Sequence, residues 1–165
     1  MARAQKEERA VRLEYHSQQF AKKLFARHPE WRRYASHYEG VEEGLPVCYL
    51  DVHVPSANPR VARPLRICTG ANQDVTVIWA GDWHMHFDPR PPGNTRPNYM
   101  ERALTAIDML VSDRLVIGAV YHAGCVTSAW VSEVSSDLPQ WLSHELGNHV
   151  EMRSWLGTHD RDIDL

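Results

Sequence analysis

The sequence predicts an α+β fold, in which N-terminal helices precede a mostly antiparallel sheet of about six strands. Helical patterns come first and short β-branched runs follow from residue 45, an order unlike the strand–helix alternation that builds a parallel sheet. One amphipathic helix, over residues 98–112, interrupts these runs and is expected to pack on one face of the sheet. The length of 165 residues fits a single domain, 1–165, with a helical segment over 1–40 and a sheet-containing body over 45–160.

The N-terminal region is expected to contain two helices. Over residues 4–27, apolar side chains recur at helical spacing, and no Gly or Pro interrupts the segment. His28-Pro29 should end this helix, and Pro29 can be the first residue of a short second helix through PEWRRYASHY, closed by Gly40. The acidic segment VEEG then reads as a linker to the body.

The body contains short runs that are typical of strands, over 45–55, 64–70, 75–81, 81–89, 114–124, 127–134 and 150–157. In the first run Cys48, Leu50, Val52 and Val54 alternate with more polar residues, so this set should face the core. The helix over 98–112 has capping-box spacing between Asn98 and Glu101 at its start. Its apolar stripe consists of Met100, Leu104, Ile107 and Val111, and residues 135–149 read as a helical turn or short helix.

Composition excludes several classes of function. The net charge of −3 and the pI near 6.3 argue against nucleic acid as the main partner. No apolar window is long enough for a membrane span, and the charged N-terminus lacks the apolar region of a secretory signal, so we expect a cytoplasmic protein without a membrane partner. The three cysteines form no CxxC pair, and P-loop and GxGxxG motifs are absent, so no cofactor is expected.

Ten histidines require that a metal site be considered. On a strand, His84 and His86 point to the same face and could share one zinc or iron ion if His53 or His122 supplied a third ligand. On this alternative interpretation, the chain is a metal-assisted enzyme. The competing reading places Trp83, Met85 and Phe87 in the core and leaves both histidines on the wetter face as hydrogen-bonding groups.

Two further motifs give little support to catalysis. His144 and His149 are five residues apart, whereas a zinc-protease helix needs histidines at i and i+4. Cys125 lies three residues after His122, but a buried cysteine in a strand-rich region is usually a packing residue. The chain is therefore expected to lack catalytic residues, although an enzyme is not excluded.

The C-terminal third is the candidate partner-binding region. Residues 128–165 hold two basic and seven acidic residues. Among six tryptophans, Trp155 is expected in the core beside Gly157, and Trp141 follows a proline and is expected to be the most exposed. An exposed tryptophan beside acids is typical of a protein-binding hot spot. The predicted binding residues are Asp137, Trp141, Glu145, Asp160, Asp162 and Asp164.

Two motifs resemble a known family. Trp83, His84, His86 and Phe87 match a strand ending in W-H-x-H-F, and Ser154, Trp155, Gly157 and Asp160 match a closing S-W-x-G-x-x-D. With the intervening helix, residues 45–162 resemble small bacterial immunity proteins of polymorphic and contact-dependent toxin systems. The resemblance implies a cytosolic inhibitor, monomeric or homodimeric, that binds one cognate toxin domain without chemistry of its own.

Overall fold

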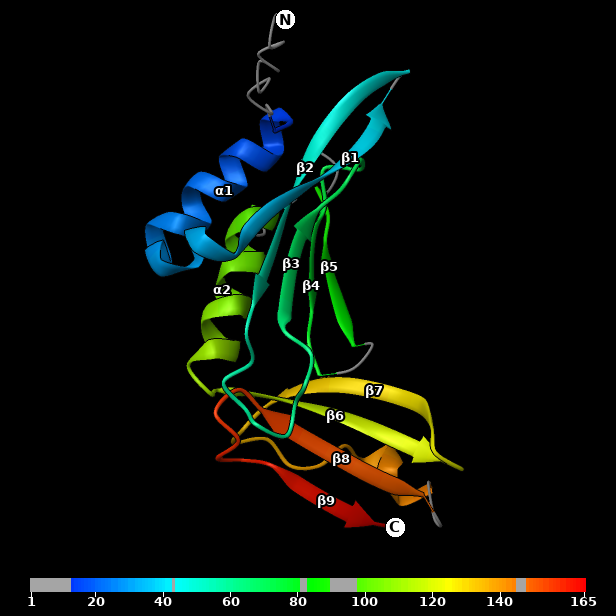
Figure 1. Cartoon of the computed structure of the whole chain (residues 1–165). Helices are drawn as coiled ribbons and strands as arrows, with labels where there is room; N and C mark the ends of the chain where they lie inside the picture. The colour runs from blue at the N-terminus through cyan, green and yellow to red at the C-terminus, as the bar shows by residue number, and fades with distance from the viewer. Residues whose placement is uncertain (1–12, 43, 81–82, 90–97, 145–147) are drawn as a thin grey trace, which may run out of the picture.

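The computed structural model describes residues 13–42, 44–80, 83–89, 98–144 and 148–165, and these form an α+β fold with two antiparallel sheets (Figure 1). The helices are α1 (Tyr15–Arg27) and α2 (Tyr99–Val111), with short 3₁₀ turns η1 (Pro29–Tyr34) and η2 (Gln140–His144). The strands are β1 (Ala35–Glu42), β2 (Leu45–Val54), β3 (Leu65–Thr69), β4 (Val75–Ile78), β5 (His84–Phe87), β6 (Leu115–His122), β7 (Cys125–Glu133), β8 (His149–Ser154) and β9 (Arg161–Asp164).

The expected single sheet of about six strands is wrong, because the described strands divide into two sheets. The first sheet is a meander in the order β1-β2-β3-β4-β5, and the second has the order β7-β6-β8-β9. Helix α2 stands between β5 and β6 in the chain, and β6 then pairs with β7 and β8 instead of extending the first sheet. Figure 1 shows the second sheet lying across the end of the first.

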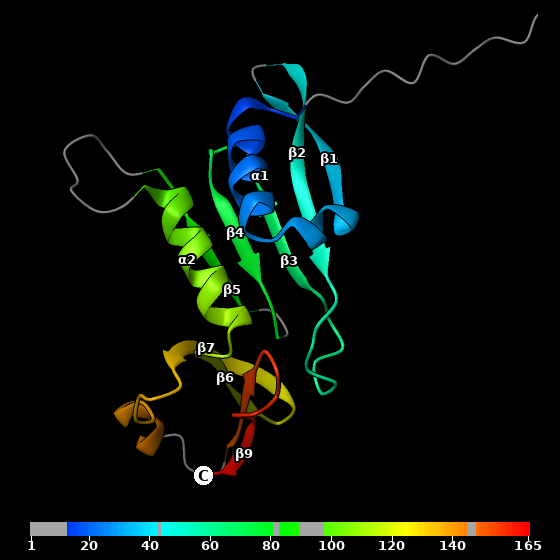
Figure 2. The same ribbon diagram turned by 90° about the vertical axis from the view of Figure 1, so that its left-hand side faces the viewer.

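The first sheet has a helix face and an open face. Helices α1 and α2 both pack on one face (Figures 1 and 2), and no other described element covers the opposite one. On the helix face Leu50, Val52 and Val54 are buried as their alternation predicted. The expected stripe of α2 is confirmed for Met100, Leu104 and Ile107, which lie in the same apolar cluster.

The N-terminal elements differ from expectation at two places. Residues 1–12 lie outside the described part of the chain, and α1 begins at Tyr15 because Leu13 bridges to Cys48 and the Glu14 side chain caps the helix by accepting from the His16 and Ser17 amides. The predicted second helix is limited to the 3₁₀ turn η1. From Ala35 to Glu42 the chain is strand β1, because it pairs along its whole length with β2, and Val41 and Glu42 of the expected linker belong to this strand.

One apolar cluster joins both sheets. It extends from Phe20 and Leu24 of α1 through the helix face of the first sheet to Leu115 and Ile117, on the inner face of the second. Trp155 is 7 % exposed, as expected for a core residue, and its ring lies 5.5 Å from that of the fully buried Trp79. The outer face of the second sheet has a smaller cluster, formed by Val116, Val120, Leu142, Val150 and Met152.

Charged side chains reinforce the contact between the two helices. Glu101 pairs with Lys23 and Arg27 of α1, and Asp108 pairs with Arg27 and His28. The capping-box expectation is therefore half right. Asn98 Oδ1 accepts from the Met100 amide at 2.9 Å, but the Glu101 carboxylate is directed to α1 instead of the cap.

A close contact on the outer face of the second sheet provides a test of this packing. An added Cβ at Gly118 would lie 2.2 Å from the indole ring of Trp130, so only glycine fits there. We expect Gly118→Ala to lower the free energy of unfolding by about 1–3 kcal/mol, measured by urea denaturation. Adding Trp130→Leu to Gly118→Ala should recover part of this loss. If the changes in unfolding free energy of the two single variants simply add in the double variant, the contact is contradicted.

Candidate functional site

The histidine pair lies on the open face of the first sheet. His84 and His86 are exposed, with their rings 5.0 Å apart in an edge-to-face arrangement. His86 Nδ1 lies 2.9 Å from Thr76 Oγ1 and 3.3 Å from Asp74 Oδ2. Trp83, Met85 and Phe87 pack against the core, so the side chains alternate as the non-metal reading predicted.

The structure does not bring the four predicted metal ligands together. His53 shares the open face but stands three strands from His84, in the row His53–Arg66–Ile78–His84. At the usual spacing between strands this separation is about 14 Å, far beyond the reach of one ion. His122 belongs to the second sheet, where its Nδ1 lies 2.7 Å from Asn148 Oδ1. Cys125, its partner across the β6–β7 hairpin, is exposed and not buried as expected.

The open face has an ion-pair network around Asp51. Arg66 donates two hydrogen bonds to the Asp51 carboxylate, at 2.8 and 3.1 Å, and His53 Nε2 lies 3.0 Å from it. Burial alone would raise the pKa of Asp51, but the hydrogen bonds from Arg66 and His53 outweigh burial and hold that pKa below its ordinary value. These contacts account for His53 without a metal.

The predicted acidic patch is divided by the structure. The Asp160 side chain is 6 % exposed, accepts from the Ser154 amide at 2.8 Å and receives the Asn58 amide on both oxygens at 3.0 Å. Asp162 pairs with Arg60 and Arg153, whereas Asp164, 94 % exposed, pairs with His149 at 2.8 Å. Asp160 is therefore a structural residue. Asp137 is exposed, and Glu145 lies outside the described residues.

Trp141 and the acidic strand lie on opposite faces of the second sheet. Trp141 is 39 % exposed, as expected, and its ring packs edge-to-face on Trp130, 5.4 Å away. Trp130 covers Gly118 on the outer face. In the register of β8 with β9, Asp162 and Asp164 pair with Glu151 and His149, whose side chains point to the inner face. The structure therefore does not bring Trp141 and the acids of β9 into one patch.

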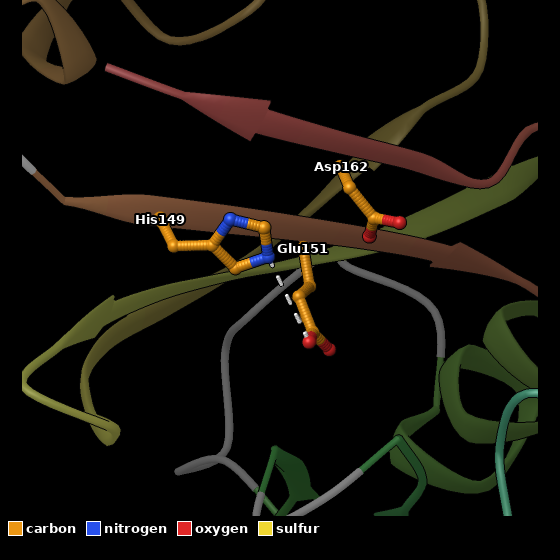
Figure 3. A group of neighbouring side chains, drawn as sticks. All are labelled: His149, Glu151 and Asp162. Atoms are coloured by element: carbon orange, nitrogen blue, oxygen red, sulfur yellow. Dashed lines mark ion pairs between the residues drawn. The ribbon is translucent and has the colours of Figure 1, made fainter.

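The inner face has a cluster that sequence reasoning missed. His149, Glu151 and Asp162 offer ligand atoms within 4.8 Å of one another (Figure 3). The carboxylate of Asp164 lies 2.8 Å from His149 Nδ1, while Nε2 lies 3.9 Å from Glu151. A carboxylate on one ring nitrogen commonly orients a histidine that binds metal through the other. One imidazole and two carboxylates could hold a divalent cation such as Zn²⁺ or Mn²⁺.

Two arginines already compensate these carboxylates. Arg153, with a side chain 9 % exposed, donates to Asp162 at 2.7 Å and lies 3.0 Å from Glu151, and Arg60 binds the other oxygen of Asp162. The hydrogen bonds from the two arginines lower the pKa of Asp162, and the one from Arg60 makes the largest contribution. A cation would have to displace or face both guanidinium groups, so the arrangement fits an ion-pair network better than a metal centre.

An apolar concavity lies elsewhere, between α2, β5 and β7. This groove has a volume of about 420 Å³ and is lined mainly by Met85, Ala106, Met109, Leu115 and Val131. Figure 2 shows the end of α2 next to β7 at this place. Ser132 and Glu133 of β7, an edge strand of the second sheet, also line the groove. The uncharged run 125–132 is the sequence signal that could have indicated this surface.

Comparisons with known proteins add no family. No family model matches the chain, and searches among curated proteins and among solved structures find no match. Neither helix of the described part of the chain has the length and apolar character that a bilayer crossing requires.

The buried acid provides one test of this site. We expect Asp160→Ala to lower the free energy of unfolding by about 1–3 kcal/mol, because the Ser154 amide and the Asn58 side chain lose their acceptor. Asp164→Ala is the matched control and should change it by about 0.5 kcal/mol or less. Equal effects in urea denaturation would contradict the assignment of Asp160 as structural.

The pH dependence of stability tests the Asp51 network. Because the folded-state pKa of Asp51 is lowered, its ionised form stabilises the fold above the ordinary carboxyl pKa of about 4, and this contribution is lost as pH falls through the folded-state pKa. Asp51→Asn should therefore lower stability at pH 7 and flatten its decline between roughly pH 5 and 3. Asp137→Asn, at an exposed position, is the control and should leave the urea midpoint unchanged at each pH. If stability falls with pH in parallel for Asp51→Asn and the wild type, the network is refuted.

Proposed function

We propose that this chain is an immunity protein, a cytosolic inhibitor that binds one cognate bacterial toxin domain and blocks it by stoichiometric contact. The resemblance in the motifs WHxHF and SWxGxxD supports this function. The observation that carries it is the β7 surface, by which we mean the free edge of β7, the apolar groove on its inner side, and the pair Trp130–Trp141 on its outer side.

The β7 surface has the properties of a protein-binding site. An exposed tryptophan on one side of the strand and a concave apolar region on the other are each typical of surfaces that contribute strongly to binding energy, because both exclude water from the contact. The groove volume falls within the range of about 300–1,000 Å³ that is usual for ligand sites. It is lined mainly by apolar side chains and holds two charged ones, Arg102 and Glu133, which could set the orientation of a partner.

Two of the residues predicted from the sequence belong to this side of the molecule. Trp141 packs on Trp130 of β7, and Asp137 lies in the connection from β7 to η2. Asp137 and Glu133 are exposed acids there and could speed the capture of a basic partner through electrostatic attraction. Asp160 and Asp162 instead act in the ion-pair and hydrogen-bond network of the inner face.

The function predicts that the chain protects cells from a toxin domain encoded beside it. Co-expression with that domain should restore growth, and the purified pair should form a one-to-one complex. Trp141→Ala should speed dissociation by roughly 30-fold, equivalent to about 2 kcal/mol for a hot-spot residue, measured by surface plasmon resonance. Leu156→Ala removes another exposed apolar side chain, from the turn after β8, and should leave the rate unchanged.

One outcome would overturn the immunity function, and another would overturn the choice of the β7 surface. Absence of protection against every toxin domain encoded next to the gene would exclude the immunity function. Equal dissociation rates for Trp141→Ala and Leu156→Ala, with protection intact, would show that the toxin binds a surface other than that of β7.

A further inference from the structure

The free edge of β7 is long and lacks the charges that usually protect such edges. β7 pairs with β6 on one side, and no described strand lies on the other. Its nine residues carry one charge, Glu133, at the C-terminal end. The other edge strands differ: β1 contains acidic residues, β9 alternates charged and apolar residues, and β5 is four residues long. Charged or short edge strands discourage pairing with another chain, whereas β7 is long and almost uncharged.

The groove is reached from this edge. Val131 and Glu133 project to the inner face and line the groove, and Ser132 between them also borders it. A strand added to β7 would direct alternate side chains to the same inner face. One of these side chains, opposite Val131, would enter the groove, while its neighbours on the outer face would lie near Trp130.

The groove distinguishes a foreign strand from a second copy of this chain. Two copies of β7 can pair antiparallel about a twofold axis with their inner faces on one side. The register of β7 with β6 shifts between Val126 and Ser128, so only residues 128–133 alternate regularly. In a regular antiparallel ladder of two copies over this part, the inner-face residue opposite Val131 is Ala129 or Val131 itself. These side chains are small and would leave most of the 420 Å³ unfilled. A partner strand with Leu, Met or Phe at that position would fill it.

We propose that β7 binds an extended strand of the partner protein by β-strand addition, with one large apolar side chain of that strand seated in the groove between α2, β5 and β7. Main-chain hydrogen bonds to the edge supply affinity, and the groove selects the side chain. The inference rests on the proposed function in that the strand belongs to the toxin domain. It does not require any enzymatic activity of the chain.

The experiment uses peptides as probes of the intact protein. A phage-displayed library of random nine-residue peptides is selected on the immobilised full chain. The selected peptides should share one large apolar residue within an alternating pattern. The best peptide is then made in two N-methylated forms, one methylated at odd and the other at even positions. Because strand addition uses the amides of one edge of the peptide, one form should lose binding at least tenfold and the other should keep it.

Two protein variants complete the test. Ala106→Phe fills the groove from α2 and should weaken the peptide at least tenfold, whereas Leu156→Lys, at an exposed position away from β7, should have no effect. Amide hydrogen exchange in the wild type should slow in β7 when the peptide binds. Equal binding of the two methylated forms, or unchanged exchange in β7, would overturn the proposal even if Ala106→Phe failed to fold.

Failure of this inference differs from failure of the proposed function. If the neighbouring toxin is neutralised while exchange in β7 is unchanged, the inhibitor function holds and strand addition is wrong. If the peptides behave as expected but no toxin is neutralised, strand addition is supported and the partner belongs to another class of protein.

Discussion

The side-chain amide of Asn58 connects the two sheets, and the rest of the structure depends on it. Asn58 is 1 % exposed, and its amide nitrogen donates to the Ser154 carbonyl at 2.8 Å and to the carboxylate of Asp160. Its Oδ1 accepts from the Arg60 amide at 2.9 Å. A buried amide without such partners would be costly. These bonds therefore fix the 55–64 connection of the first sheet against the turn that follows β8.

The same turn explains the motif S-W-x-G-x-x-D in structural terms. Ser154 Oγ accepts from the His159 amide at 3.1 Å, and Gly157 has φ +79°, where most other residues would be strained. The Gly157 backbone also lies close to Asn58, because an added Cβ would meet its amide at 3.4 Å. The motif residues therefore tie the turn after β8 to the 55–64 connection of the first sheet. The groove shares no residue with this junction.

The sequence predicted the α+β class, the α2 stripe and the alternation around His84 and His86, because each depends on local spacing. It did not predict β1, since PEWRRYASHY has helical composition and only its last four residues, ASHY, become a strand through pairing with β2. Nor could it place Asp162, because the face of a residue in β9 is set by its register with β8. The groove combines α2, β5 and β7, which no pattern along the chain relates.

The junction also has a consequence for the order of folding. The first sheet is a meander in which every strand pairs with its neighbour in the sequence, so its contacts are local and can form early. The bond from Asn58 to Asp160 joins residues 102 positions apart. During synthesis the first sheet emerges well before β8 and β9, which are the last strands of the chain. The second sheet is therefore expected to dock last and, in unfolding, to separate first, while the β1–β5 meander persists.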